Sequence, residues 1–577
     1  MDNLAVARVL AEIGDLLEIK GDNPFKIRAY RNAADTLASA TAVSELTDAE
    51  LLELPGIGRD IAKKVREILE TGDASVHREL IEEFPPTILD ILRLQGIGPR
   101  TVRQLYAELG IRTLDDLEAA ARDGRIEGLR GMGPRKRDQI LKALENRQRY
   151  AGRHLLPDMH DVAAALVGWL RESLPDRDVI PVGSLRRGCE TCGDLDVLVV
   201  GAGAEALDRF TGYRLVDQVL ARGETKASVK LWGGVQADLR LVGAESRGAA
   251  MQYFTGSKGH NIALRDRALQ QGLKLNEYGV FRSEDASGVA GAREEEVYQA
   301  LGLAWIPPEL REGRGEIEAA AANRLPRLID RADLRGDLHV HTTATDGRDD
   351  IDAMARAALA TGLEYLAITD HSQALAMANG LDERRALEHA RRIRDANSRL
   401  DGLTLLAGIE CDIRSDGTLD LADDCLAQLD YVVASVHSNF AQDARQMTDR
   451  VLRAMECPWV DTIGHLTGRL LLRRDPHKVD VGAVVEAAAR MGVALEINCQ
   501  VDRLDLNEVH ARLARDRGVK LVIASDAHSQ AALGVLRWGV QVARRAWIEP
   551  GDVLNTLPLA EFRGALRRQR SRGAGSN

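Results

Sequence analysis

The feature that most constrains the fold is a series of short apolar runs in the second half of the chain. "DLHVH" at 337–341 is followed by "LEYLAITDH", "LTLLAGIECD", "LDYVVASVH", "WVDTIGH", "VALEINC" and "VKLVIASDAH", with helical patterns between them. Strands that alternate with helices in this way predict a parallel sheet or barrel. In a barrel, the carboxyl ends of the strands converge on one face.

Histidines and carboxylates lie where these runs end. Two of them, His339 and His341, alternate on the first run, so both imidazoles face one point. The full set is His339, His341, Asp346, His371, Glu410, His437, His465, Asp526 and His528. A lone buried histidine is more often a hydrogen-bonded core residue, but recurrence at strand ends favours a metal site. Imidazoles mixed with carboxylates suit Zn²⁺, Mn²⁺ or Fe²⁺. The set exceeds the need of one ion, so we predict two or three ions that act on a phosphoester.

A second cluster of carboxylates lies nearer the N-terminus, in "GSLRRGCETCGDLDVLV" at 183–199. Asp194 and Asp196 alternate on a predicted strand, so both face one side, and Asp238 lies in a later strand, "QADLRLV". Three carboxylates from two strands suit two hard cations such as Mg²⁺, the arrangement that supports in-line phosphoryl transfer. Aspartates on the solvent face of an edge strand are the alternative, which the apolar neighbours disfavour.

A turn precedes this strand and carries groups that suit phosphate. Gly183 and Ser184 open the turn and offer backbone N–H and hydroxyl groups, and Arg187 can neutralise negative charge. The same segment contains a C-x-x-C at Cys189 and Cys192. No second pair follows at zinc-finger spacing, so a zinc or redox role is not expected.

Residues 1–145 read as helices joined by a repeated Gly-apolar-Gly turn. The turns are "LPGIGRDIAKKV" with Gly56 and Gly58, "LQGIGPRTVRQL" with Gly96 and Gly98, and the looser "LRGMGPRKRDQI" at 129–140. Such turns let backbone N–H groups at a helix start approach a phosphate without reading bases. Ordinary helix-to-helix turns are the alternative. Two copies followed by basic residues favour DNA binding.

Composition sets the outer limits. The 577 residues predict three to five domains, and 45% hydrophobic with 29% charged residues fit a globular protein. No apolar run is long enough for a membrane span, and six cysteines give no disulfide framework, so we expect a cytoplasmic protein. A net charge of −11 argues against a uniformly basic nucleic-acid binder but not against local basic faces.

These motifs together resemble a known family. The G-S…G-D-x-D pattern is similar to nucleotidyltransferases, and "YFTGSKGHNIALRDRALQQGLKLNEYGVF" at 253–281 narrows the resemblance to the family X DNA polymerases, the group of DNA polymerase beta. The histidine set resembles the polymerase and histidinol phosphatase (PHP) domain attached to bacterial members. The resemblance covers about residues 1–570.

The resemblance implies a multidomain fold. It predicts a helical helix-hairpin-helix N-terminal region, an α+β nucleotidyltransferase palm and a C-terminal, distorted TIM-like (β/α) PHP barrel. The predicted boundaries are 1–80 for a lyase-like domain, 81–150 for a DNA-binding subdomain, 151–250 for the palm, 251–310 for nucleotide selection, 311–333 for a linker, 334–570 for the PHP domain and 571–577 for a disordered tail.

The resemblance also implies roles for individual residues. The three aspartates hold two Mg²⁺ ions, and Asp238 helps to activate the primer 3′-hydroxyl. The implied dNTP contacts are Gly183, Ser184, Arg187, Gly193, Tyr253, Phe254, Gly256, Lys258 and Asn261. The implied DNA contacts are Gly56, Gly58, Gly96, Gly98, Arg240 and Arg265. Tyr253, Phe254 and Gly256 line the sugar pocket, Asn261 touches the base, and Arg265 meets the template.

Some positions depart from the family pattern. Lys258 and Ile262 replace a base-stacking Asp and a template-side Lys, which leaves fidelity and template dependence open, and Leu155 replaces an Arg on the triphosphate side. A 5′-deoxyribose phosphate lyase is a further open prediction: Lys64 matches its nucleophile. The surrounding positions match at Lys26 and Tyr30 and differ at Asp60, Leu52 and Phe25.

The sequence therefore predicts a bacterial DNA repair enzyme, associated with the nucleoid, with two active sites. The palm fills short gaps in base excision repair, and the PHP site, with Mn²⁺ or Zn²⁺, supplies 3′→5′ exonuclease and 3′-phosphoesterase activity and sometimes cleavage at abasic sites. Arg469 is a candidate phosphate contact there, with a surface salt bridge as the alternative. The substrate is a gapped or primer–template duplex held mainly through phosphates. Alternatives are a PHP phosphoesterase with the polymerase half as a DNA-docking module, a histidinol-phosphatase type of enzyme, and a non-enzymatic DNA-end scaffold.

Overall fold

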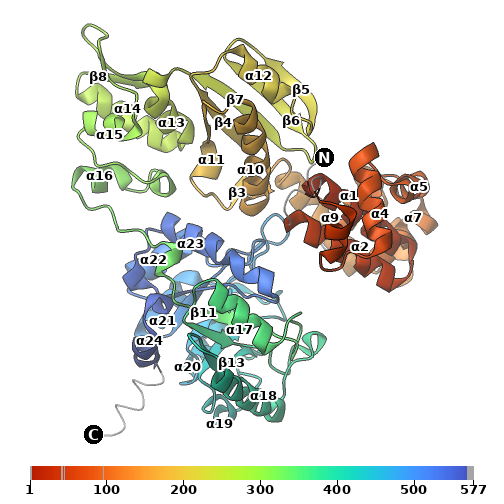
Figure 1. Ribbon diagram of the computed structural model, residues 1–577. Coiled ribbons are helices and arrows are strands. Elements are labelled where there is room, and N and C mark those ends of the chain that lie inside the picture. The colour runs from red at the N-terminus through yellow and green to blue at the C-terminus, as the bar shows by residue number, and fades with distance from the viewer. Residues whose placement is uncertain (1–2, 40–42, 44–45, 95, 568–577) are drawn as a thin grey trace, which may run out of the picture. The chain divides into compact units, whose positions relative to one another are not determined.

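The computed structural model describes residues 3–39, 43, 46–94 and 96–567 (Figure 1). The chain divides into two compact units, Met1–Ala151 and Gly152–Asn577. The predicted tail at 571–577 lies outside the described residues. None of the helices in the described ranges is long and apolar enough to cross a membrane.

The first unit is helical throughout its described residues. Its helices are α1 (Asn3–Lys20), α2 (Pro24–Ser39), α3 (Asp48–Glu53), α4 (Arg59–Thr71), α5 (Ser75–Glu83), α6 (Ile88–Leu92), α7 (Pro99–Leu109), α8 (Leu114–Arg122) and α9 (Pro134–Arg149). Apolar residues at helical spacing on α1, such as Leu10, Ile13 and Leu17, meet Val65 of α4 and Leu105 of α7 in one buried cluster. The long α1 is thus the centre of this unit.

The second unit begins with the palm. Its elements are β1 (His154–Leu155), α10 (Leu156–Ser173), β2 (Asp178–Pro181), α11 (Gly183–Arg186), β3 (Thr191–Cys192), β4 (Asp194–Val200), α12 (Ala204–Thr211), β5 (Val216–Arg222), β6 (Lys226–Leu231) and β7 (Gln236–Val242). The main sheet has the order β2-β4-β7-β6-β5, with only β4 and β7 parallel among its described pairs.

Apolar and acidic side chains alternate at the start of β4 and so point to opposite faces of the sheet. Leu195, Val197 and Val199 pack into a core with residues of α10 and α12. The intervening Asp194 and Asp196 therefore point to the opposite face of the sheet. The palm sheet thus has one apolar face and one face that carries the carboxylates.

A smaller helical and three-stranded part follows the palm. Its elements are α13 (Arg247–Thr255), α14 (Lys258–Gln270), β8 (Leu273–Asn276), β9 (Gly279–Arg282), β10 (Gly288–Ala290), α15 (Glu294–Ala300) and α16 (Glu316–Ala321). Arg311 and Glu316, at the start of the predicted linker, are fully buried. Arg311 pairs with Glu294 at 2.7 Å, and Glu316 contacts the ring of His260 at 2.8 Å. The chain is therefore anchored on this part at least as far as α16.

The rest of the unit is a parallel barrel wrapped by helices (Figure 1). Its strands are β11 (Gly336–Val340), β12 (Tyr365–Ile368), β13 (Thr404–Asp412), β14 (Tyr431–Ser435), β15 (Thr462–Ile463), β16 (Ala494–Asn498) and β17 (Leu521–Ala524). Its helices are α17 (Ile351–Ala360), α18 (Glu383–Ala396), α19 (Asp423–Leu426), α20 (Ala444–Glu456), α21 (Val481–Met491), α22 (Glu508–Asp516), α23 (Leu536–Arg545) and α24 (Leu559–Ala565). The strands pair in chain order, and a parallel bridge between Val340 and Ala527 nearly closes the ring.

The sequence sets the direction and the ends of these elements. Five of the helices begin at an Asp or Asn whose side chain accepts a hydrogen bond from the N–H group three residues later, which satisfies one of the free donors of the first turn. These N-cap residues are Asp350, Asp382, Asp443, Asp480 and Asn507. The caps define where these helices begin, and each helix leads the chain back to the next parallel strand. The carboxyl ends of the strands therefore lie together at one rim. The predicted fold class is confirmed, whereas the finer domain boundaries stay predictions.

The opposite end of the barrel is filled with apolar side chains. Phe562 of α24 is fully buried, with its ring stacked on Tyr365 at 5.2 Å between centroids and tilted against Tyr431 at 6.1 Å. On β14 the inward positions pass from Tyr431 and Val433 to Ser435 and then His437, beyond the strand end. The interior therefore changes from an apolar floor to a polar rim along each strand.

Two candidate metal centres

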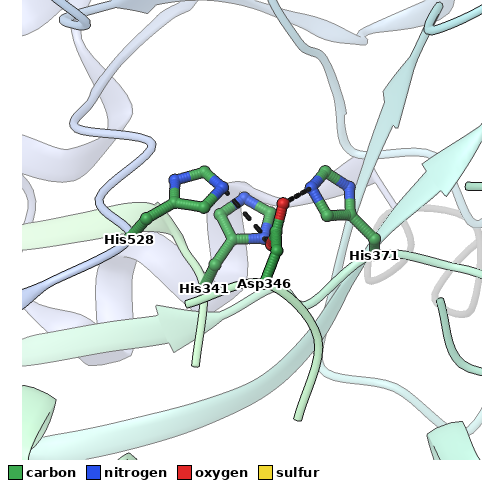
Figure 2. Close-up of side chains that lie close together, drawn as sticks. All are labelled: His341, Asp346, His371 and His528. Carbon is green, nitrogen blue, oxygen red and sulfur yellow. Dashed lines mark ion pairs between the residues drawn. The ribbon is translucent and has the colours of Figure 1, made fainter. Parts of the chain in front are cut away.

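All nine predicted ligands of the PHP barrel meet at its polar rim. One group contains His341, Asp346, His371 and His528, with ligand atoms within 4.8 Å of one another (Figure 2). Asp346 is the hub of this group: its carboxylate oxygens lie 3.4 Å from His371 Nε2 and 3.4 Å from His528 Nε2. The rings of His341 and His528 stack with centroids 4.2 Å apart. Since Asp346 and His528 are about one-third exposed, this group faces the mouth of the site.

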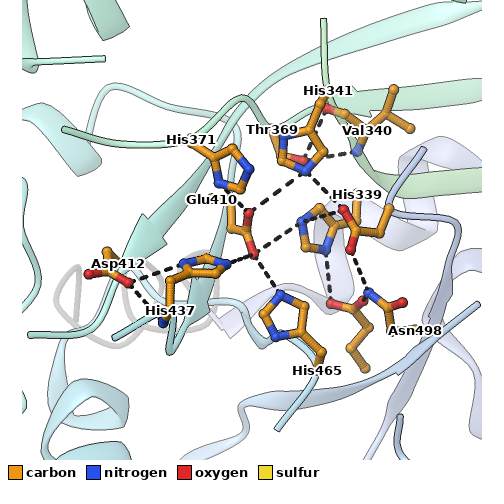
Figure 3. A network of polar contacts seen from close by, with 12 residues as sticks. His339, Val340, His341, Thr369, His371, Glu410, Asp412, His437, His465 and Asn498 are labelled. Atoms are coloured by element: carbon orange, nitrogen blue, oxygen red, sulfur yellow. Dashed lines mark hydrogen bonds and ion pairs between the residues drawn. The ribbon is translucent and has the colours of Figure 1, made fainter. Parts of the chain in front are cut away.

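Glu410 is the centre of the deeper part of the rim (Figure 3). Its Oε2 lies 2.7 Å from His371 Nδ1, and its Oε1 lies 3.0 Å from His465 Nε2, 3.3 Å from His437 Nε2 and 3.4 Å from His339 Nε2. Another group joins His339 and His341 with Asp526, whose Oδ1 is 3.1 Å from His341 Nε2. The groups share members, as expected for adjacent cations bridged by carboxylates.

The unpaired donor atoms of this rim fit metal ions. His339 Nε2, both nitrogens of His341, His371 Nδ1 and Glu410 Oε2 are buried and make no hydrogen bond with any described residue. His371 Nδ1 and Glu410 Oε2 are close, yet their geometry is not that of a hydrogen bond. Buried polar atoms left unpaired are costly, so lone pairs aimed at shared points indicate cation sites. The donor set of imidazole and carboxylate suits Mn²⁺ or Zn²⁺.

The carboxylates and histidines of the rim strongly shift one another's pKa values. Burial opposes the ionised form of Glu410, but the histidines His437, His339 and His371 hold its pKa well below the usual range. Burial also opposes protonation of His371, but the charges of Glu410 and Asp346 raise its pKa to about 10. For His341, burial and the neighbouring His371 lower the pKa to about 4. Positive charge is therefore strongly favoured around Glu410.

Sequence reasoning missed the residues that orient these ligands. Glu496 accepts from His339 Nδ1 at 3.0 Å, and Asp412 lies 3.1 Å from His437 Nδ1. Such carboxylates fix the tautomer and orientation of a metal-binding histidine. Both residues follow the alternation of their strands, in "VALEINC" and "GIECD". The signal was therefore present, since Asp412 lies two residues after Glu410 and faces the same side.

The palm brings the three predicted aspartates together. Asp196 and Asp238 are paired neighbours on β4 and β7, and carboxylate oxygens of both lie within 4.8 Å of one from Asp194. Burial, reinforced by the charges of Asp194 and Asp238, raises the pKa of Asp196 to about 6. Three mutually repelling carboxylates on one sheet face fit divalent cations, which would remove that repulsion.

Asp238 is held by β6 and its own strand. Its Oδ1 is 3.0 Å from Lys226 Nζ and accepts from the hydroxyl of Ser228, and its Oδ2 accepts from Gln236 Nε2 at 2.8 Å. Burial opposes ionisation, yet these hydrogen bonds lower the pKa of Asp238. Asp238 is therefore ionised and fixed in orientation.

The turn at the start of α11 packs directly on Asp196. Gly183 has φ +68°, and a Cβ there would lie 2.5 Å from Asp196 Oδ2, so no other residue fits without displacing the carboxylate. The hydroxyl of Ser184 is buried and lies close to the thiol of Cys192. Gly193 precedes β4 directly. Arg187 ends the turn and pairs with Glu312 at 2.9 Å.

The segment after α13 carries the predicted sugar and base contacts. Asn261 is fixed from two sides: Nδ2 donates to the carbonyl of Tyr253 at 2.7 Å, and Oδ1 accepts from Gln252 at 2.8 Å. The ring of Phe254 lies 5.1 Å from that of Tyr253 and 4.8 Å from the guanidinium of Arg240. Gly256 is buried, and Lys258 and Arg265 are exposed on α14. These roles remain predictions.

The three Gly-apolar-Gly turns have one geometry. Gly56, Gly96 and Gly131 have φ of +78°, +78° and +81°. The second glycine of each turn, including Gly58 and Gly98, is the N-cap of α4, α7 or α9, and no described side chain caps these helices. The apolar middle residue is buried in every copy, and an exposed arginine follows. The third copy, looser in sequence, has the same structure as the others because the glycines decide it.

Two further predictions concern single cations. Lys64 Nζ lies 3.2 Å from Glu67 and 3.1 Å from Ser75 Oγ, so its lyase role stays a prediction. Arg469 is 7% exposed and forms a two-pronged ion pair with Glu190 of the palm, at 3.1 and 2.6 Å. The guanidinium is thus engaged in an ion pair, as in the alternative to a phosphate contact, with the arginine buried and the glutamate 29% exposed.

Comparison with known proteins agrees with this architecture. Family models match a helix-hairpin-helix domain at 1–74, a SAM-like helix-hairpin-helix tandem at 88–146, a DNA polymerase beta thumb at 250–312 and a PHP domain at 337–500. Hairpins, palm, thumb and PHP barrel on one polypeptide define a family X DNA polymerase with an attached PHP domain.

Individual relatives refine the class. The DNA polymerase/3′-5′ exonuclease PolX of Bacillus subtilis (strain 168) is 36% identical over 567 residues, 98% of this chain and 99% of that protein. The chain belongs to the PolX family. DNA polymerase lambda of Rattus norvegicus is 26% identical over 54% of this chain and 56% of its own length. A probable phosphatase of Thermoanaerobacter sp. (strain X514) is 29% identical over 38% of this chain and 89% of its own length. The predicted family is confirmed.

Proposed function

We propose that this chain is a DNA polymerase that fills short gaps and that trims or unblocks 3′ ends at a second site in its PHP barrel. The observation that carries the proposal is the presence of two complete ligand clusters, on the palm and on the barrel rim, in a chain that matches PolX over 98% of its length. A relic at either site would be expected to have lost ligands.

In the palm, Asp194, Asp196 and Asp238 would hold two Mg²⁺ ions, which activate the primer 3′-hydroxyl and neutralise the triphosphate when bound. Asp238 is ionised and firmly held, which suits it to hold the cation that would activate this hydroxyl. The buried hydroxyl of Ser184 and the guanidinium of Arg187 would hold the triphosphate. The sugar and base would contact the Tyr253–Asn261 segment.

In the PHP barrel, the nine rim residues would hold two or three Mn²⁺ or Zn²⁺ ions, which activate water and polarise the phosphoester when bound. Glu410 would bridge ions at the deep end. Asp346 and His528 lie at the exposed mouth, where a 3′ end can enter. Glu496 and Asp412 would keep His339 and His437 in the ligating orientation.

The DNA substrate is proposed to be a gapped or primer–template duplex. Helix starts without a side-chain cap at Gly58 and Gly98, each followed within two residues by an exposed arginine, offer phosphate contacts that are indifferent to sequence. Repair of short gaps, as in base excision repair, suits such a grip. We place the protein with the bacterial nucleoid, in the cytoplasm, because that is where its substrate lies.

The alternative is a phosphoesterase whose polymerase half only docks DNA. One experiment separates the two: a one-nucleotide-gapped duplex with labelled primer, supplied with Mg²⁺ or Mn²⁺, with and without dNTPs. The wild type should extend and trim, Asp196→Ala should only trim, and His341→Ala should only extend. Asp217→Ala, an exposed aspartate on β5 of the same sheet, is the matched control and should do both. Extension that survives Asp196→Ala, or trimming that survives His341→Ala, would defeat the assignment.

A further inference from the structure

The turn that carries Arg187 is fixed by contacts from outside the palm. The guanidinium of Arg187 lies between two partners: Nε is 2.9 Å from Glu312 Oε1, and Nη1 donates to the carbonyl of Thr255 at 2.5 Å. The side chains of Arg187 and Glu312 are 15% and 18% exposed. An ion pair so shielded from water is stronger than a surface pair. Glu312 therefore decides where this guanidinium points.

Glu312 is shared with the PHP domain. Its Oε1 also accepts from Nη1 of Arg545 at 2.9 Å, and the same nitrogen donates to the main-chain carbonyl of Arg187 at 2.8 Å. Arg545 is the last residue of α23 and is 7% exposed. Its Nη2 is 3.3 Å from Glu508. One buried arginine of the PHP domain thus contacts both the backbone of Arg187 and the carboxylate that pairs with its side chain.

The same helix also contacts the turn through Gln541. Gly188 has φ +64°, and a Cβ there would lie 1.9 Å from Gln541 Nε2 of α23, so the Gln541 side chain packs directly on the backbone of the turn. Arg544, adjacent to Arg545 on that helix, pairs instead with Glu309 at 2.7 Å. Arg544 therefore also joins the PHP domain to the segment that contains Glu309 and Glu312. It makes no contact with Arg187 or Glu312 in the described structure.

We propose that Arg545 is a positioning residue for the polymerase reaction, supplied by the PHP domain, which keeps Arg187 available to the triphosphate. The inference rests on the proposed role of Arg187. With Arg545 in place, the charge of Glu312 is divided between two guanidinium groups. Without it, Glu312 has Arg187 as its one close guanidinium among the described residues, and the triphosphate must compete with an undivided carboxylate.

This mechanism predicts a specific kinetic pattern in single-nucleotide insertion on a gapped duplex. Arg545→Met should raise the KM for dNTP about tenfold, the effect of one charge-assisted hydrogen bond, and change kcat much less. Arg545→Lys, which keeps the charge, should recover most of the affinity. Glu312→Gln added to Arg545→Met should also recover it, because the competing charge is then gone. Trimming of the 3′ end, which uses the other site, should be unchanged in Arg545→Met.

Controls separate positioning from simple attachment of the two domains. Arg544→Met removes a neighbouring ion pair of the same interface and should lower the thermal midpoint about as much as Arg545→Met while leaving KM unchanged. Equal KM values for Arg545→Met, Arg544→Met and wild type, with a raised KM for Arg187→Ala, would overturn the inference and leave the proposed function intact. An unchanged KM for Arg187→Ala would overturn the inference together with the proposed triphosphate contact of Arg187. If Arg545→Met does not fold, Arg545→Lys and Glu312→Gln are read in the same assay: Glu312→Gln alone should lower KM, and a KM that rises instead would overturn the proposal.

Discussion

Glu294 offers a prediction whose size follows from the structure. The carboxylate is 4% exposed and lies 2.8 Å from Arg186, 2.7 Å from Arg311 and 3.0 Å from Trp305 Nε1. Burial alone would raise the pKa of Glu294, but hydrogen bonding to Arg186 and the charge of Arg311 outweigh it and lower the pKa to about 2. Replacement by Gln imitates the protonated acid and leaves the buried guanidinium of Arg311 and the partly buried one of Arg186 without this anion.

The magnitude follows from the difference between the ordinary pKa of 4.5 and the folded value of about 2. At about 1.4 kcal/mol per unit, Glu294→Gln should lower the free energy of unfolding by about 3 kcal/mol at pH 7. Because the folded pKa is depressed, this contribution is present above pH 4.5 and is lost as the pH falls toward 2. The gap between wild type and variant should therefore be constant from pH 8 to 5 and narrow below about 4.5.

Urea unfolding from pH 8 to 3.5, followed by tryptophan fluorescence, measures this gap, since groups that titrate alike in both proteins cancel. Glu295→Gln is the matched control: this neighbour on α15 is about half exposed, and its nearest cation, Arg293, is 3.8 Å away. The control should stay within about 0.5 kcal/mol of wild type. A Glu294→Gln variant as stable as wild type at pH 7, or a gap that does not narrow between pH 5 and pH 3.5, would refute the reasoning.

Three further predictions follow from the sites. Glu496→Gln, which weakens the contact to His339, should reduce Mn²⁺ affinity about 10–100-fold by calorimetry while gap filling is retained; unchanged affinity would exclude an orienting role. Removal of metal with EDTA should lower the thermal midpoint and restored Mn²⁺ should raise it again, whereas a midpoint indifferent to both would contradict cation binding by the folded state. Gly183→Ala should displace Asp196 and reduce extension at least about tenfold, with trimming unchanged as the internal control; full extension would show that the turn adapts.

The ligands could be predicted because they obey strict local rules. Each lies where an apolar run ends, and parallel strands bring such ends together whatever the helices between them do. Alternation along a strand placed Asp194 and Asp196 on one face, and Asp238 was predicted to join them from a later strand. The carboxylates that orient the ligands, such as Glu496, follow the same strand alternation, but the sequence does not show which histidine each one contacts.

Contacts between domains could not be predicted at all. The pairing of Arg469 with Glu190, like that of Arg545 with Glu312, joins residues hundreds of positions apart. No local periodicity encodes such a pair, because it depends on how two finished surfaces meet. The predicted linker at 311–333 illustrates the same limit: only the three-dimensional structure shows that Arg311 and Glu316 are buried, each against a partner.

The near-closure of the barrel means that cations bound at its rim would also act on the stability of the ring. In the described structure the first and last strands are joined across their seam by the bridge from Val340 to Ala527, and His339 and His341 lie on one side of it with Asp526 on the other. A cation held by that trio would act as a clasp, tying the beginning of the domain to a point nearly two hundred residues later. Hydrogen exchange along this seam would then report loading of the site, and cleavage competence and closure of the ring would be gained in the same event.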